Sequence, residues 1–220
     1  MSRKTLIKEF SLQTASNFVS PLRREEASKF LGRLLESLGQ YVDARNTRFL
    51  SKDLAFDYQL TVTLLAGAAH VVFEPHLVTS TLLKGFNRPN LEFVSECFIK
   101  IFEAAMPNPV INTTITFSAH CTFSSQADYS EFMEPFISKK LGIDSGGRLV
   151  SGVGRNFDGS LRIFTEKSAS FEDALFVIET FVTKEPVKAD LFARMITRSV
   201  ELLDTLGLTV DFEDPVKPQA

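Results

Sequence analysis

The stretch INTTITFSAHCTF, residues 111–123, decides the fold because its side chains alternate between two chemical sets without interruption. A period of two places successive side chains on opposite faces of a β-strand. Ile115, Phe117 and their like would face a core, and Thr116, Ser118 and His120 would face the other way. At about 3.3 Å per residue such a strand would be about 43 Å long, which predicts a large, curved sheet.

Strand and helix patterns alternate on both sides of this segment. Apolar residues at steps of three and four predict helices, and alternating residues predict strands. Pro135 should kink one helix, and Gly207 should end the last one. The expected strands cover 5–12, 54–64, 69–78, 111–123, 148–157, 160–167 and 174–183, and the expected helices cover 21–42, 91–105, 128–137 and 188–206.

Both parts of the chain therefore follow the order strand, helix, antiparallel strands, helix. This order predicts an α+β fold of two similar halves, with a pseudo-two-fold, saddle-like antiparallel sheet and the helices packed on one face. The halves would be 1–108 and 109–214, packed as one compact unit, with a flexible tail at 215–220. The element order resembles the saddle-shaped repeats of TATA-binding proteins or, alternatively, a helix-grip fold with a cavity, and a likeness of order alone implies no function.

Composition excludes several classes of protein. Hydrophobic residues make up 44% of the chain and charged residues 23%, which is enough to bury a core. The net charge is −3 and the basic residues are scattered, so nucleic acid and anionic membranes are unlikely partners. No run of apolar residues is long enough for a membrane span or a signal peptide. Cys97 and Cys121 occupy apolar positions, which predicts free thiols and a cytoplasmic location.

A glycine-rich stretch, SGGRLVSGVGRNFDGSLRIF (145–164), raises the question of phosphate binding. A phosphate-binding loop must be followed directly by a helix, because the helix N-terminus binds the anion. Here a strand pattern follows, and Asp158-Gly159 is a turn signal, so the stretch predicts a β-hairpin. Gly152 and Gly154 would permit a bulge, a bend or the close approach of a helix or ligand, and Arg155 could still face a partner.

A polar sheet face is the main candidate for a site. If Leu64 pairs with Ala69, directly opposed residues lie about 5 Å apart, and Asp57 would face His76 as an acid–imidazole pair. Asp57, Glu74 and His76 offer three groups of metal-ligand type, although no H-E-x-x-H or C-x-x-C spacing supports a metal site. The alternative is an ordinary solvated face. The predicted partner surface comprises Asp57, Gln59, His70, Glu74, His76, Thr116, Ser118, His120 and Arg155.

Enzymatic signatures are absent from the sequence. His120 and Cys121 are neighbours in a strand, so they point to opposite faces and cannot act together, and there is no G-x-S-x-G motif. We therefore expect a non-enzymatic cytoplasmic interaction protein, a complex subunit or homo-oligomer that binds a macromolecule through a sheet face or edge without a cofactor. Alternatives are a small-ligand binder with a Phe-lined cavity, in which Thr116, Ser118 and His120 orient the ligand, and a metal-dependent enzyme.

Overall fold

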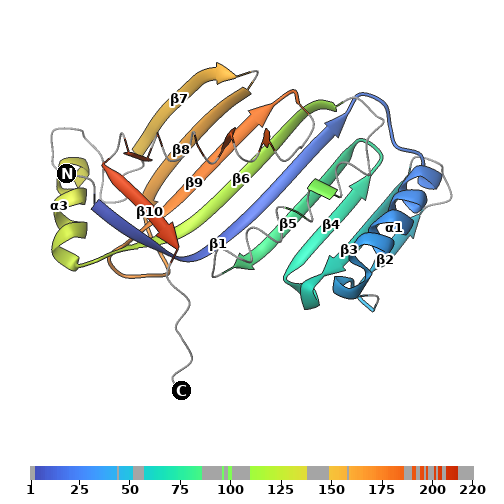
Figure 1. The fold of residues 1–220 in the computed structure, drawn as a ribbon, viewed down its shortest axis with the longest axis horizontal. Helices are drawn as coiled ribbons and strands as arrows, with labels where there is room; N and C mark the ends of the chain where they lie inside the picture. The colour runs from blue at the N-terminus through green and yellow to red at the C-terminus, as the bar shows by residue number, and fades with distance from the viewer. Residues whose placement is uncertain are drawn as a thin grey trace.

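In the computed structural model the described residues form one ten-stranded sheet (Figure 1). The strand order is β2-β3-β4-β5-β1-β6-β9-β8-β7, and β10 pairs with β1. The structure describes residues 3–43, 45–51, 57–85, 96, 99–100, 110–137, 149–157, 159–185, 190–191, 194–195, 197, 201, 203–204 and 207–212.

The elements before residue 100 comprise five strands and one long helix among the described residues. They are β1 (Arg3–Phe18), α1 (Arg24–Leu38), β2 (Arg48–Ser51), β3 (Tyr58–Leu64), β4 (Ala69–Glu74) and β5 (Leu77–Gly85), with short 3₁₀ turns at Gly39–Tyr41 and Leu65–Gly67. The later elements are β6 (Val110–Phe123), α3 (Gln126–Ile137), β7 (Leu149–Phe157), β8 (Gly159–Lys167), β9 (Ala174–Thr183) and β10 (Leu208–Phe212).

β6 lies in the centre of the sheet, antiparallel to β1 on one side and to β9 on the other. Its alternation is as predicted: Ile115, Ala119 and Cys121 are buried in the core. Ile111 is an exception, with 52% of its surface exposed. Its pairing explains this, because β9 pairs with β6 only from Thr113 onward and leaves the first residues of β6 without that neighbour.

The helix α1 packs on one face of the sheet through Ala27, Phe30 and Leu34, which are all buried. The ring of Phe30 contacts that of Phe73 in β4, with centroids 4.4 Å apart. The helix was expected to begin at Pro21, but it begins at Arg24. The carboxylate of Glu26 accepts a hydrogen bond from the backbone N–H of Arg23, the N-cap residue, at 2.7 Å. This bond stabilises the start of the helix at Arg24.

The expected return strand 69–78 is two strands. β4 ends at Glu74, residues 75–76 form a turn, and β5 begins at Leu77. After the turn, the side chains that face the core are offset by one residue from the alternation in β4. Leu77 and Val78 are both apolar, so this offset cannot be seen in the sequence. The first strand is also longer than the predicted 5–12.

β10 was not predicted. Gly207 adopts the left-handed φ of 72°, consistent with its expected role as a stop. The five residues that follow pair in parallel with the start of β1, from Arg3↔Leu208 to Ile7↔Phe212. They occupy the edge of β1 that β5 leaves uncovered, since β5 pairs with β1 only from Phe10 onward.

Within the glycine-rich stretch, residues 149–157 and 159–164 lie in the two strands of the predicted hairpin. β7 and β8 are antiparallel neighbours, and their register shifts between Ser151 and Gly154 and again between Gly154 and Phe157. The expected bulge thus falls beside Gly154. A strand follows the glycines directly, so the helix N-terminus that a phosphate loop requires does not follow them.

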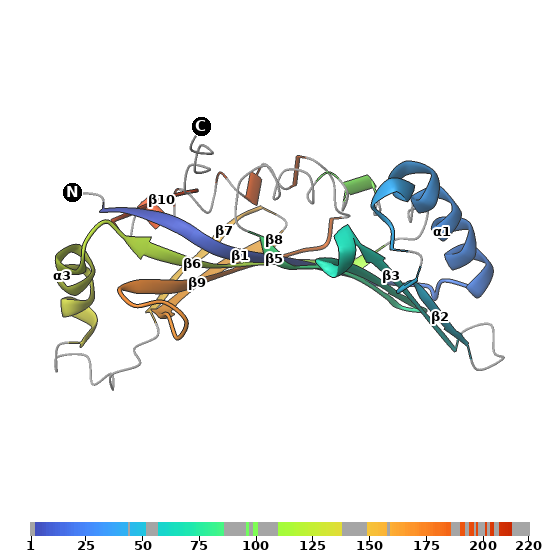
Figure 2. The same ribbon diagram turned by 90° about the horizontal axis from the view of Figure 1, so that it is seen from below.

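α1 and α3 occupy different places on the sheet. Figure 2 shows α1 above one end, whereas α3 stands at the opposite end. The expected helices 91–105 and 188–206 lie mostly outside the described residues, so the expectation that all helices share one face stays a prediction. None of the helices in the described part of the chain has the length and apolar character needed to cross a bilayer.

Candidate functional site

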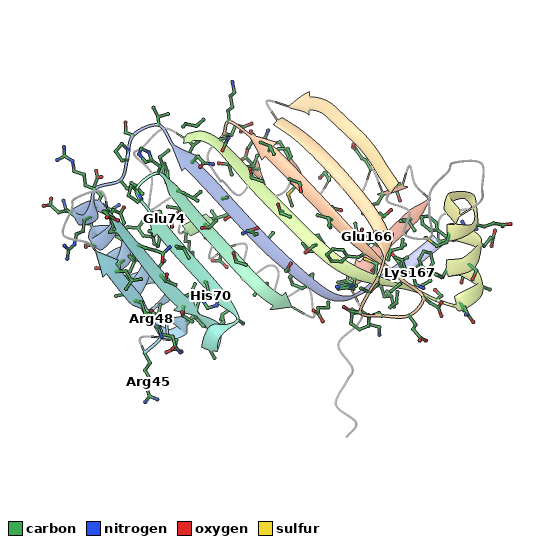
Figure 3. All side chains as sticks on the ribbon, turned by 180° about the vertical axis from the view of Figure 1, so that it is seen from behind. Arg45, Arg48, His70, Glu74, Glu166 and Lys167 are labelled. Carbon is green, nitrogen blue, oxygen red and sulfur yellow. The ribbon has the colours of Figure 1, made fainter. Side chains whose placement is uncertain are left out.

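The sheet has two chemically different faces. One face packs against α1 and carries the buried apolar side chains. We call the opposite side, which Figure 3 views directly, the open face. Neither described helix, α1 nor α3, lies across the centre of the open face (Figure 2).

The predicted register of β3 and β4 is confirmed, with Leu64↔Ala69 and Thr63↔His70 as cross-strand partners. Gln59 Nε2 donates a hydrogen bond to Glu74 Oε1 at 2.9 Å, as their predicted opposition requires. Thr63 Oγ1 donates to the Asn46 carbonyl at 3.0 Å and lies 3.3 Å from His70 Nδ1. The Thr63 hydroxyl hydrogen is donated to the Asn46 carbonyl. In the contact between Thr63 and His70, the hydrogen therefore comes from His70 Nδ1.

The predicted Asp57–His76 pair does not form. His76 lies in the turn between β4 and β5, and Asp57 precedes the first residue of β3; both side chains are exposed. The strand that should have carried His76 ends two residues before it. Among the described residues, which include Asp57, Glu74 and His76, no group of three His, Cys, Asp or Glu side chains is placed to hold a metal ion.

The structure places Thr116, Ser118 and His120 on the open face. The Ser118 hydroxyl lies 2.6 Å from that of Ser11 across the strand pair. Because successive side chains of a strand point to opposite faces, a cavity between the sheet and α1 would be lined by the other residues of β6. Thr116, Ser118 and His120 point away from such a cavity. The backbone of Arg155 lies in β7, and its side chain is outside the described part of the chain.

The middle of the open face is a surface that sequence reasoning only partly identified, and we call it the central patch. Its side chains are uncharged, and each of them is partly or fully exposed. The members are Leu77, Thr79 and Thr81 of β5, Ser11, Gln13, Ala15 and Asn17 of β1, Asn112, Thr114, Thr116 and Ser118 of β6, and Ile178, Thr180 and Val182 of β9.

A row of methyl-bearing side chains crosses the central patch perpendicular to the strands and continues beyond it onto β4 and β3. Strand register places one residue from each of six neighbouring strands in this row. Five spacings of about 4.8 Å give it a length of about 24 Å. The row is Thr61, Val72, Thr79, Ala15, Thr114 and Val182.

Cross-strand hydrogen bonds fix the polar side chains beside this row. Asn17 Nδ2 donates to Asn112 Oδ1 at 2.7 Å, and the hydroxyls of Ser11 and Ser118 are 2.6 Å apart. Side chains held in this way lose little further conformational freedom when a partner binds.

An aromatic cluster adjoins the central patch. The His120 ring lies 4.6 Å from that of Phe176 in β9 and 5.3 Å from that of Phe171, measured between centroids. His120 Nδ1 lies 2.9 Å from Ser168 Oγ, which also accepts the backbone N–H groups of Ser170 and Phe171. The Ser168 hydroxyl hydrogen is therefore directed at His120 Nδ1, which accepts it. Ser168 thus caps the turn that carries Ser170 and Phe171.

The core face carries polar groups that sequence reasoning missed. Thr14 and Ser80 face each other in register, both fully buried, and their hydroxyls have no hydrogen-bond partner. By contrast, the Ser16 and Thr113 hydroxyls are paired at 3.0 Å. Burial, with a smaller effect of Glu179, raises the pKa of the Cys121 thiol to about 12, so this thiol is not a nucleophile at neutral pH.

Comparison with protein-family models, curated proteins and solved structures finds no match to this chain.

Proposed function

We propose that this chain is a non-enzymatic interaction protein whose central patch binds another protein. The observation that carries the proposal is the chemistry of the patch: none of its described side chains is charged. A sheet face that only meets water usually carries Lys, Glu and Arg, and the buried centre of a protein–protein interface is depleted in these residues.

The size of the patch supports a protein partner. The patch covers four neighbouring strands, β5, β1, β6 and β9, so it is about 14 Å wide, and it is about 20 Å long from Ser11 to Asn17, which gives a footprint of about 290 Å². A standard interface buries about 800 Å² on each partner, so the patch would form the centre of such an interface and the residues around it the rim. The Thr methyl groups, Ala15 and Val182 supply apolar contact, and the fixed hydroxyl and amide groups supply directional hydrogen bonds.

Nucleic acid fits this surface poorly. Binding to a phosphate backbone requires Lys or Arg side chains that replace its counterions. Within the described patch no such side chain is present, and Arg48 lies at the lateral end of the open face with His70 and Glu74 (Figure 3).

We further propose that 1–108 and 109–214 are structurally similar halves. Outward from the centre, the strands are β1, β5, β4, β3 and β2 on one side and β6, β9, β8 and β7 on the other, so the two series correspond over their first four strands. Each series follows the same chain order, with a helix after the first strand. The partner would then meet equivalent strands of both halves across the β1–β6 pair.

The proposal is tested by placing a charge in the patch. Thr114→Lys puts an ammonium group in the methyl-bearing row, and Leu35→Lys, on the outer side of α1 where Leu35 is 43% exposed, is the matched control. Wild type and both variants, each confirmed to be folded by circular dichroism, are used as bait in source-cell extract and analysed by native mass measurement. A stoichiometric partner, including a second copy, should be lost with Thr114→Lys and retained with Leu35→Lys. Equal retention by both variants contradicts the proposal.

A further inference from the structure

We infer that the aromatic cluster of His120, Phe171 and Phe176 receives an arginine side chain of the partner, an inference that rests on the proposed function. The cluster is continuous with the central patch, since Ser118↔Ile178 and His120↔Phe176 are successive open-face pairs of β6 and β9. A protein that covers the patch therefore reaches the cluster at its edge.

Two phenylalanine rings and the imidazole present aromatic faces at the edge of the patch. The contact between Ser168 Oγ and His120 Nδ1, at 2.9 Å, holds the imidazole beside the two phenylalanine rings. The rings of Phe171 and Phe176 flank the imidazole, and all three residues are partly exposed. A guanidinium group stacks on such rings, because their faces carry negative charge density.

Several acidic residues are cross-strand partners or chain neighbours of the residues in the cluster. Glu9 is the β1 partner of His120, and Glu166 is the β8 partner of Phe176. Glu172 and Asp173 follow Phe171 in the same turn. Glu9 and Glu166 have interactions of their own, and their charge acts through space in addition to these.

Two cations are also near the cluster, and carboxylates still predominate. Lys8 precedes Glu9 at the bulge of β1, and Lys167 follows Glu166. Figure 3 shows Glu166 and Lys167 at the end of the open face away from Arg48 and His70. The combination of aromatic faces with excess negative charge selects a planar cation, which can stack on a ring and donate hydrogen bonds to a carboxylate at the same time.

The test is a titration of the full chain with methylguanidinium chloride, followed by NMR of histidine side chains, with sodium chloride at equal ionic strength as the reference. The chain has three histidines, so His120 is assigned from the signal that disappears in His120→Gln. We expect a saturable shift of the His120 signal that exceeds those of His70 and His76. The apparent affinity should fall at least threefold in Phe176→Leu and in Glu9→Gln, and should not change in Glu36→Gln, on the exposed side of α1.

A response equal to that of sodium chloride overturns the inference, as does unchanged affinity in a folded Glu9→Gln variant. Methylammonium chloride is the second probe: binding at least as tight as that of methylguanidinium would also overturn it, because it would indicate a charge site without stacking. No partner is needed for this titration. If the titration is negative but a partner is lost in Thr114→Lys, the arginine site is refuted and the proposed function stands. If the titration is positive but no such partner is found, the arginine site stands and the proposed function is refuted.

Discussion

Replacing Thr14 by valine should stabilise the protein. The Thr14 and Ser80 hydroxyls are completely buried, oppose each other in register and have no hydrogen-bond partner. A buried polar group left unpaired costs about 1–3 kcal/mol, and valine has nearly the same shape as threonine, so no cavity forms. We expect the free energy of unfolding to rise by about 1 kcal/mol, which corresponds to about 2–4 °C in Tm for a chain of this size.

Urea unfolding followed by circular dichroism measures this change, and the comparison is valid if the slope m is the same for both proteins. Thr113→Val is the control with the opposite sign, because it removes the hydroxyl that pairs with Ser16 at 3.0 Å and should lower the free energy of unfolding by about 1–3 kcal/mol. A Thr14→Val variant less stable than wild type by more than about 1 kcal/mol refutes the reasoning, since it would show that a buried water satisfies the hydroxyl.

Two further perturbations follow from the backbone and the core. Ala66 has a left-handed φ of 53°, so Ala66→Gly should stabilise by about 1 kcal/mol in urea unfolding, whereas Ala68→Gly, at φ −72°, should destabilise by about 0.5–1 kcal/mol. Burial raises the pKa of Cys121 from 9.0 to about 12 and that of Tyr58 from 10.0 to about 12. Both groups stay neutral to a higher pH in the folded protein than in the unfolded chain. The free energy of unfolding is therefore unaffected by them below about pH 9, and it falls as the pH rises toward 12, because ionisation then favours the unfolded chain. The urea midpoint should fall over that interval, and less so in Cys121→Ala; a constant midpoint would contradict these pKa shifts.

The sequence allowed the antiparallel sheet to be predicted because strong alternation survives tertiary packing. Residues 111–123 form one continuous strand in β6, and the Gln59–Glu74 contact follows from a register inferred from the Ala66–Gly67 turn. The site was harder to predict. Pro75 and His76 form a turn between apolar residues, and its change of phase is invisible in a hydrophobicity pattern.

Long-range register determined the rest of the site. Phe171 lies in a turn about fifty residues after His120. The pairing of β9 with β6 places this turn beside His120. The central patch is likewise a property of several strands. No single segment reveals that Thr79, Ala15 and Thr114 lie in one row, because the neighbours of β1 in the sheet are distant from it in the chain.

The parallel pairing of β10 with the start of β1 has a consequence for synthesis on the ribosome. The hydrogen bond from Thr5 Oγ1 to the Thr209 carbonyl spans a sequence separation of 204 residues. The edge of β1 at Arg3–Ile7 is therefore covered only after residues 208–212 have been translated. Until residues 208–212 are available this edge has unpaired backbone groups, and a nascent chain stalled before residue 208 would present them to neighbouring chains or to a chaperone.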